Sequence, residues 1–381
     1  MLLYPKETQM QKQYFQYLFL FLIFTTYSTV AFSEDEPKTL SPILENGIAW
    51  YDAAQWSCEG RGWNDTSTPF TRLPERAKEH VTAAVWNLSQ CSAGLIIRFK
   101  TNASKIQVRH QVAGNLSMPH MTTVGSSGLD LYARDNNGHW RWAGSSKPTA
   151  KKYEETILQG VSSEMRDYAL YLPLYNTTTA LSLGVSENNV FEAITPSEKK
   201  PVFYYGTSIT HGCSASRPGM TVPAILGRQF DRPVINFGFS GNAKMEHDLA
   251  KIISEVDASA FIFDCLPNMS PQQVQERAET FIREVCNSHP NTPIILVEDR
   301  TFTNAWLKPD EQKLHSERRK FLRQTYEKLT TEGMKNLIYV EGQHLLGDDD
   351  EGTIDSSHPT DLGMVRMANI LQPILKKILE K

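Results

Sequence analysis

The sequence predicts two domains, an antiparallel β-sandwich of jelly-roll type followed by a parallel sheet with helices on both faces. From about residue 45 to residue 192, short runs of alternating apolar and polar residues are separated by Asn, Gly and Ser turns, a pattern typical of half-buried strands. After the polar linker Ser197–Lys200, compact apolar runs alternate with helical patterns, which indicates a parallel sheet. We therefore expect a sandwich domain over residues 40–195 and an α/β domain over residues 200–381.

Residues 1–33 are expected to form a signal peptide rather than part of the fold. Two lysines precede the apolar run Tyr17–Phe24, and the small residues Ala31 and Ser33 stand two apart after it, as a signal peptidase requires. The run is shorter than the roughly 20 apolar residues that span a bilayer, so an uncleaved anchor is the weaker alternative. We expect export to the periplasm or the medium of a bacterium.

Composition excludes several classes of protein. The 381 residues carry 39 basic and 43 acidic side chains, a formal net charge of −4, so an electrostatic nucleic-acid binder is not expected. The 5 cysteines leave at least one free thiol, and the one disulfide that the sequence suggests is Cys58–Cys91. No Cys-x-x-Cys motif occurs and the 10 histidines are scattered, so we expect no metal and no cofactor.

In the first domain, alternation marks the strands. It is clearest at Leu95–Phe99, Lys105–His110, Tyr168–Leu174 and Leu181–Val185. The one segment with a helical pattern is Arg76–Val85.

In the second domain, five apolar runs predict the sheet. The expected strands are Val202–Tyr205, Val234–Phe237, Ala260–Phe263, Ile294–Val297 and Leu337–Val340. The expected helices are Val222–Phe230, Lys244–Val256, Pro271–Ser288, Asp310–Glu332 and Leu362–Leu379. Parallel sheets bind ligands outside the carboxyl ends of their strands, so a functional site is expected at that edge.

Polar loops follow the expected strands at this edge. They are Gly206–Gly212, Gly238–Asn242, Asp264–Asn268 and, before the last helix, Asp355–Pro359. Together they hold a hydroxyl, an amide, exposed backbone N–H groups, an imidazole and a carboxylate. This set of groups is the one that acyl transfer requires.

Each of these residues also has a structural explanation. Ser208 could cap a helix, and it does not stand in the Gly-x-Ser-x-Gly turn of α/β-hydrolases. The spacing of Asp355 and His358 is common by chance, while Asn268 and Gly241 could be ordinary turn residues. The coincidence of all four motifs at strand ends of one domain favours the functional interpretation.

The motifs resemble those of the SGNH (GDSL-like) hydrolase family. Gly-x-Ser-Ile-Thr at Gly206–Thr210, the glycine after the second strand, the asparagine after the third and Asp-x-x-His-Pro at Asp355–Pro359 carry the resemblance. The first domain resembles the N-terminal β-sandwich that precedes one branch of this family. Its marker Gly-x-Asp-Leu-Tyr occurs here at Gly128–Tyr132, and Arg72–Pro74 and Val85–Ser89 fit the same domain.

The resemblance implies a three-layer α/β/α esterase with a five-stranded parallel sheet, acting on O-acyl, above all O-acetyl, groups of carbohydrates. It implies Ser208 as the nucleophile, His358 as the base and Asp355 as the residue that orients His358. The backbone N–H of Ser208, with Gly241 and Asn268, is implied as the oxyanion hole.

The third motif departs from the family pattern Gly-x-Asn-Asp, because the chain reads Cys265-Leu266-Pro267-Asn268-Met269. Asn268 is retained as an oxyanion donor because it stands at the right strand end. It also begins one of six Asn-x-Ser/Thr sequons, but a glycan there would block the site, so we interpret the sequon as accidental.

Residues near the nucleophile loop are weaker candidates. Arg217 and His211 could contact the substrate, although a structural salt bridge is an equal explanation for Arg217. Glu298, Asp299 and Arg300 end the fourth strand and could reach the same edge.

A second hypothesis is a carbohydrate-binding protein whose hydrolase-like domain is inactive. It would use the tryptophans of the first domain as sugar platforms, although Trp side chains are more often buried. These tryptophans are Trp50, Trp56, Trp63, Trp86, Trp140 and Trp142. In either case the expected partner is an acylated carbohydrate or small ester, with no nucleic acid and no membrane beyond the export signal.

Overall fold

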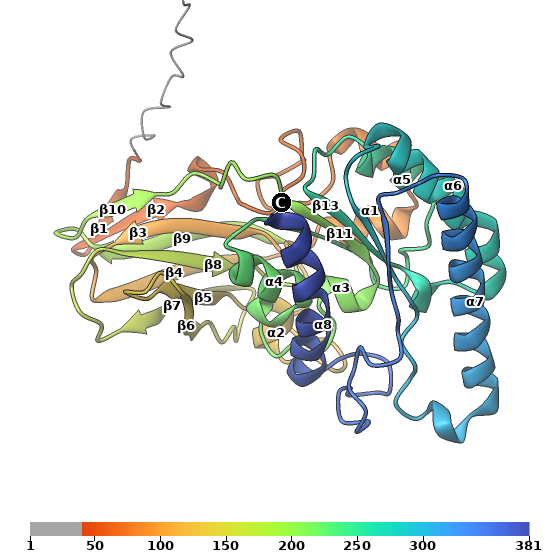
Figure 1. Ribbon diagram of the computed structural model, residues 1–381. Coiled ribbons are helices and arrows are strands. Elements are labelled where there is room, and N and C mark those ends of the chain that lie inside the picture. Colours follow the sequence, from red (N-terminus) through yellow and green to blue (C-terminus); the bar gives the residue numbers. More distant parts are fainter. Residues whose placement is uncertain (1–39, 381) are drawn as a thin grey trace, which may run out of the picture. The chain divides into compact units, whose positions relative to one another are not determined.

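The computed structural model describes residues 40–380, which contain three β-sheets (Figure 1). Two sheets are antiparallel and belong to the N-terminal half of this range, and the third is parallel and belongs to the C-terminal half. The expected signal peptide, residues 1–33, lies outside the described residues. No helix in the described range is long and apolar enough to cross a membrane.

The two antiparallel sheets form a β-sandwich. The first has the strand order β1 (Ile43–Glu45), β2 (Ile48–Asp52), β9 (Thr178–Ser186), β4 (Lys105–Val112) and β7 (Lys152–Gln159). The second has the order β10 (Phe191–Ala193), β3 (Ile96–Thr101), β8 (Arg166–Tyr171), β5 (Asp130–Arg134) and β6 (Trp140–Ser145). Alternate apolar side chains of both sheets, such as Val108 and Leu170, pack in one core. The predicted sandwich is confirmed.

The helix predicted over Arg76–Val85 is wrong as a single element. A 3-10 turn covers Glu75–Glu79, and a separate helix, α1 (Ala83–Ser89), follows it. Thr82 is extended, and its side chain accepts a hydrogen bond from the Val85 N–H. This N-cap starts a new helix instead of continuing the turn. The short helix α2 (Thr123–Ser127) completes this half.

All cysteines in the described range are free thiols, so the candidate Cys58–Cys91 disulfide is not formed. Cys58 packs in the sandwich core, whereas Cys91 follows α1 and its carbonyl accepts a hydrogen bond from Arg72.

The third sheet contains the five predicted parallel strands. Its order is β12 (Val234–Gly238), β11 (Val202–Gly206), β13 (Ala260–Asp264), β14 (Ile294–Val297) and β15 (Leu337–Val340). Because β12 and β13 pair with opposite edges of β11, the chain changes direction across the sheet at β11. Such a switch point is where open parallel sheets place their sites.

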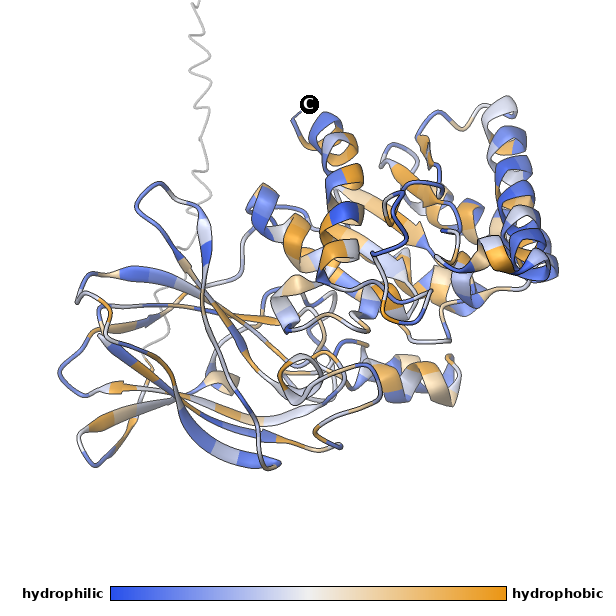
Figure 2. Cartoon of the chain, turned by 90° about the horizontal axis from the view of Figure 1, so that it is seen from below, coloured by the Kyte–Doolittle hydropathy of each residue, from blue (hydrophilic) through white to orange (hydrophobic). Residues whose placement is uncertain are grey.

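Helices cover both faces of this sheet, as predicted. They are α3 (Ser208–His211), α4 (Val222–Phe230), α5 (His247–Ile253), α6 (Pro271–Ser288), α7 (Pro309–Thr331) and α8 (Asp361–Leu379). Phe203 and Tyr205 pack in the core with α5, α6 and α7, whereas Val202 and Tyr204 pack in the core with α4 and α8. The helices carry both hydrophobic and hydrophilic residues, as expected of helices with one buried face (Figure 2).

Helix α5 is shorter than the predicted Lys244–Val256. Met245 has φ +52°, outside the helical region, so the helix begins only after Glu246. A hydrophobic pattern does not reveal such a backbone kink.

Candidate active site

Ser208 lies directly after the central strand β11. Thr207 is extended, and its side chain accepts a hydrogen bond from the Ile209 N–H, so Ser208 is the first residue of α3. The Ser208 hydroxyl oxygen lies 2.8 Å from Nε2 of His358, although the two residues are 150 positions apart in the chain. Ser208 is 8% exposed, so the residue is held in a packed loop.

Asp355 contacts the second ring nitrogen of His358, Nδ1. Its Oδ2 lies 2.7 Å from Nδ1 of His358. Its Oδ1 accepts hydrogen bonds from the backbone N–H groups of Ser357 and His358, at 3.1 and 2.7 Å. These contacts fix the carboxylate and make Nδ1 the protonated ring nitrogen, which leaves Nε2 free to accept the serine proton. The structure therefore brings Ser208, His358 and Asp355 together.

Gly241 and Asn268 lie on two loops that are joined by a hydrogen bond. Asn268 ends a 3-10 turn after β13, and its amide donates to the Phe239 carbonyl at 3.3 Å, two residues before Gly241. Gly241 has φ +70°, a conformation that favours glycine, and open space surrounds the position of a Cβ. The arrangement leaves the second amide hydrogen of Asn268 available to a further acceptor.

The pKa of His358 is raised to about 9. The largest contribution comes from the Cys213 side chain, and the Asp355 carboxylate adds to it, whereas burial acts in the opposite direction. Both neighbours stabilise the charged imidazolium. The resulting stabilisation of the fold is complete below the ordinary value of 6.5 and is lost as the pH rises through about 9.

This shift predicts the pH dependence of any reaction that uses His358 as a base. Because only the neutral imidazole accepts a proton, kcat/KM for p-nitrophenyl acetate should rise with pH with its midpoint near pH 9 rather than 6.5. Cys213→Ala should move the midpoint down toward 6.5 without reaching it, because Asp355 remains. Initial rates measured against a Ser208→Ala blank test this. A midpoint that does not move in Cys213→Ala contradicts the assigned cause.

The structure does not place His211 or Arg217 where they would contact a substrate bound at Ser208. His211 is fully buried, its Nε2 donates to the Leu174 carbonyl at 2.7 Å, and burial holds its pKa well below the ordinary value. Arg217 forms the salt bridge that was the alternative, with its guanidinium 2.8 Å from the buried carboxylate of Asp130. Both residues support the loop after Ser208 instead of facing a substrate.

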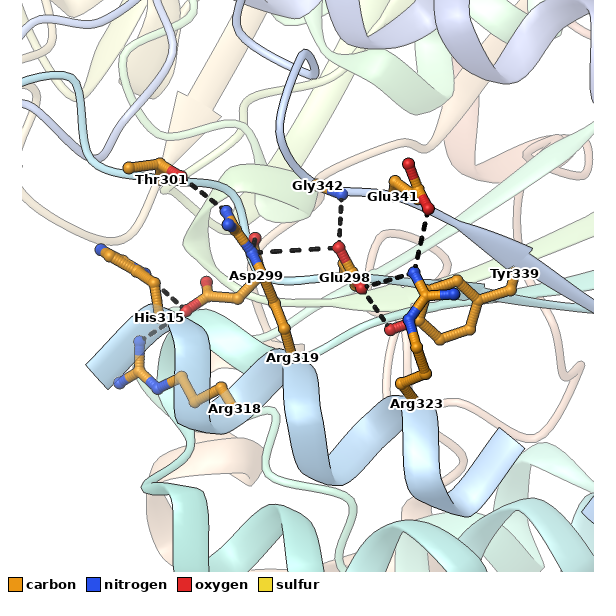
Figure 3. Close-up of polar contacts among 10 residues, drawn as sticks. All are labelled: Glu298, Asp299, Thr301, His315, Arg318, Arg319, Arg323, Tyr339, Glu341 and Gly342. Atoms are coloured by element: carbon orange, nitrogen blue, oxygen red, sulfur yellow. Dashed lines mark hydrogen bonds and ion pairs between the residues drawn. The ribbon is translucent and has the colours of Figure 1, made fainter. Parts of the chain in front are cut away.

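Glu298 and Asp299 make their side-chain contacts with α7 (Figure 3). Asp299 contacts His315 at 2.7 Å and Arg318 at 2.9 Å, and Glu298 contacts Arg323 at 3.0 Å. Burial alone would raise the pKa of Asp299, but His315 and Arg318 outweigh it and hold the pKa below its usual range. This network ties α7 to the end of β14. The next residue, Arg300, pairs with the buried Asp264.

Two residues of the N-terminal half support the site and were not expected there. The buried guanidinium of Arg72 donates to the carbonyls of Asn236 and Gly238 at 3.0 Å each, just before the Gly241 loop. Asp130 accepts from Arg217 and from the Gly219 N–H, both at 2.8 Å, in the loop after Ser208.

Arg72 and Asp130 stand in the two motifs that marked the resemblance of the first domain, and that is the signal that could have located them. Tyr175 adds a third contact, because its hydroxyl donates to the Ser208 carbonyl at 3.3 Å. The sandwich therefore contacts the loops that carry Ser208 and Gly241.

No group of three or more His, Cys, Asp or Glu side chains that could hold a metal ion occurs among residues 40–380.

Family comparisons match both halves of the chain. Residues 199–376 match the GDSL-like lipase/acylhydrolase family, and residues 48–191 match the N-terminus of SGNH-hydrolase-type esterases. No curated protein sequence matches the chain.

Solved structures show the same relationship. A protein from Bacteroides ovatus that is described as a GDSL-like lipase is 34% identical, with 87% of this chain and 98% of that one aligned and a TM-score of 0.84. A salicylyl-acyltransferase from a tetracycline biosynthetic pathway is 17% identical over 89% and 92% of the two chains, with a TM-score of 0.64. A family two carbohydrate esterase from Cellvibrio japonicus is 14% identical over 87% and 98%, with a TM-score of 0.56.

The last two likenesses concern the fold alone, whereas the first carries sequence identity over nearly the whole described chain. Together with the two family matches, it shows that the chain belongs to the GDSL-like (SGNH) lipase/acylhydrolase family and carries that family's GxDLY N-terminal domain.

Proposed function

We propose that the protein is a serine esterase that hydrolyses O-acyl esters through an acyl-enzyme on Ser208. The observation that carries the proposal is the continuous chain of contacts from Ser208 through His358 to Asp355, at 2.8 and 2.7 Å. A serine hydroxyl becomes a nucleophile when a neighbouring base accepts its proton, and the base acts when a carboxylate fixes its tautomer.

In the proposed reaction, the Ser208 oxygen attacks the ester carbonyl carbon while His358 takes the hydroxyl proton. The carbon–oxygen bond to the alcohol then breaks, and His358 returns the proton to the alcohol oxygen. Water attacks the acyl-enzyme with His358 again as the base, which releases the carboxylic acid and restores Ser208. The negative oxygen formed in each attack would be held by the N–H groups of Ser208 and Gly241 and by the Asn268 amide.

Asn268→Ala tests the oxyanion hole. Loss of one preorganised donor should lower kcat by about 10²- to 10³-fold with little change in KM, because the donor acts on charge that exists only in the transition state. Steady-state kinetics with p-nitrophenyl acetate measure the two constants. Asn242→Ala is the matched control, since the amide of Asn242 bonds to the carbonyl of Ser240. Equal rates in the two variants would remove Asn268 from the oxyanion hole.

For the substrate, we propose O-acetyl groups on carbohydrates. The family two carbohydrate esterase of similar fold supports this class. The side chains of Asp355 and His358 are about a quarter exposed, which suits an ester at the edge of a large glycan. Thr303 also donates to the Ser356 carbonyl at 3.0 Å, and the segment after it carries Trp306, which is 68% exposed. An exposed aromatic face of this kind can stack on a sugar ring.

Acetate release from a panel of acetylated glycans tests the substrate class, and a chain-length series of nitrophenyl esters tests the acyl preference. The proposal expects acetate release from at least one acetylated glycan and falling kcat/KM as the acyl chain lengthens. Activity confined to long-chain esters would contradict it.

The alternative of an inactive carbohydrate-binding protein has less support. Trp50, Trp56 and Trp63 are at most 8% exposed and cannot serve as sugar platforms. Trp142 is exposed, but its indole N–H donates to Asp130 in the contact with the C-terminal half. Glycan binding without esterase activity would favour this alternative.

We also propose that the protein is exported from a bacterial cell. The support is the N-terminal sequence alone, with its apolar run Tyr17–Phe24 and the small residues before position 34. Sequencing the N-terminus of the protein secreted by its host would test cleavage after residue 33.

A further inference from the structure

His120, a residue of the N-terminal half, lies beside the proposed triad. Its Nε2 is 3.8 Å from Oδ2 of Asp355. Its ring centroid is 6.4 Å from that of His358, and the two ring planes differ by 23°. Among the described residues, the other contacts of this carboxylate come from Ser357 and His358, on its own segment. His120 is therefore the contact that reaches Asp355 from another part of the fold.

The backbone at His120 has a conformation that glycine adopts most readily. The Met121 N–H donates to the Met118 carbonyl at 3.1 Å, which closes a four-residue turn with Pro119 second and His120 third. His120 has φ +69°. Proline second and a positive φ third define a type II turn, in which glycine is the preferred third residue. A histidine held there against this preference points to a role for its side chain.

The turn is fixed by packing on the C-terminal half. Met121 is 7% exposed and belongs to the core cluster that contains Ile209 and Ala215 of the nucleophile loop, and Met118 packs against the same cluster. The backbone position of His120 is therefore fixed by the same core cluster that holds the residue after Ser208, Ile209.

Asp355, by contrast, lies on a segment without regular secondary structure between β15 and α8. Its carboxylate is bound by groups two and three residues away on the same segment. A partner on a separate element restricts the rotation of the carboxylate relative to the rest of the site.

We propose that His120 is a positioning residue that holds Oδ2 of Asp355 against Nδ1 of His358. The proposal rests on the function proposed for Ser208, His358 and Asp355. It makes the sandwich part of the esterase site, because the carboxylate is then oriented from both halves of the chain.

Kinetics of His120→Ala and His120→Gly test the proposal in the full mature chain. Each should lower kcat for p-nitrophenyl acetate about tenfold, because the carboxylate is less well oriented, and leave KM within about twofold. His120→Gly should melt no lower than the wild type, because glycine relieves the positive φ, so its loss of activity cannot come from unfolding.

His139→Ala is the matched control. His139 is also an exposed imidazole of the sandwich, 3.7 Å from an aspartate, Asp135. Its substitution should leave kcat and KM unchanged. Equal losses in the His139 and His120 variants would overturn the proposal.

A double-mutant cycle separates positioning from substrate contact. In an Asp355→Asn background, His120→Ala should lower kcat by less than about twofold, because the carboxylate that it positions is gone. A tenfold loss that persists in that background, or a rise in KM with kcat unchanged, would assign His120 to the substrate and overturn the proposal.

The NMR signal of the His358 Nδ1 proton gives a readout that needs no turnover. In Ser208→Ala, this signal should shift or broaden when His120→Ala is added, and should not change when His139→Ala is added. If the wild type hydrolyses no ester, the proposed function fails while this comparison still applies. An unchanged signal would overturn the role of His120 alone.

Discussion

Ser208→Ala is expected to lower kcat/KM for p-nitrophenyl acetate by about 10⁴-fold or more, because the acyl-enzyme route is removed. Residual hydrolysis above the rate in water should remain, since oxyanion donors still bind the transition state. The fold should be unaffected, because the hydroxyl makes one side-chain contact, with His358. Rates and circular dichroism of the purified variant measure both effects.

Ser216→Ala is the control for this variant. Ser216 is an exposed serine of the same loop, and its hydroxyl contacts Asp361 instead of His358. Its substitution should leave kcat/KM within about twofold, as surface changes away from a site usually do. Ester hydrolysis that survives in Ser208→Ala at the wild-type rate would exclude Ser208 as the nucleophile.

Arg72→Met is expected to have the largest effect on stability, a loss of about 3–5 kcal/mol in the free energy of unfolding. The Arg72 guanidinium is buried and donates to four backbone carbonyls, those of Leu88, Cys91, Asn236 and Gly238. Burial lowers its pKa to about 10, so the group stays charged at neutral pH and these acceptors compensate the charge. Methionine fills similar volume but leaves the carbonyls without this donor.

Urea unfolding of Arg72→Met and Arg76→Met measures the difference. Arg76 lies four residues further on, is half exposed, and pairs with Asp65 and Glu255 at the surface. Its substitution should cost less than about 1 kcal/mol. Similar losses in both variants would show that the buried contacts of Arg72 do not join the two halves as described. Arg72→Met should also lower kcat, because Gly238 leads into the Gly241 loop.

The sheet was predictable because strands buried on both faces consist of uninterrupted apolar residues. The sequence contains five such runs, and each is a strand of the parallel sheet. The exact ends of two helices could not be predicted in the same way. The N-cap at Thr82 divided one predicted helix, and the positive φ of Met245 shortened another. Neither event changes the hydrophobic pattern on which the predictions relied.

At the site, position at a strand end predicted Ser208, Gly241, Asn268 and the segment of His358 as neighbours, because the topology of a parallel sheet gathers these ends. The structure brings Ser208 and His358 into contact. The same reasoning failed for His211, which follows the same strand but turns into the core. Arg72 and His120 could not be found in this way. Their contacts depend on how the sandwich packs against the α/β half. The family motif at Arg72–Pro74 marked Arg72 without revealing this packing, and none of the motifs contains His120.

The most direct test of the account is to identify the residue that carries the acyl group. The wild type is mixed with p-nitrophenyl acetate, quenched with acid during the first turnover, and its peptides are analysed by mass spectrometry. The account predicts an acetyl group on the peptide that contains Ser208, and none on the same peptide of Ser208→Ala. A burst of nitrophenol with the acetyl group on another residue, or with no acetylated peptide, would contradict it.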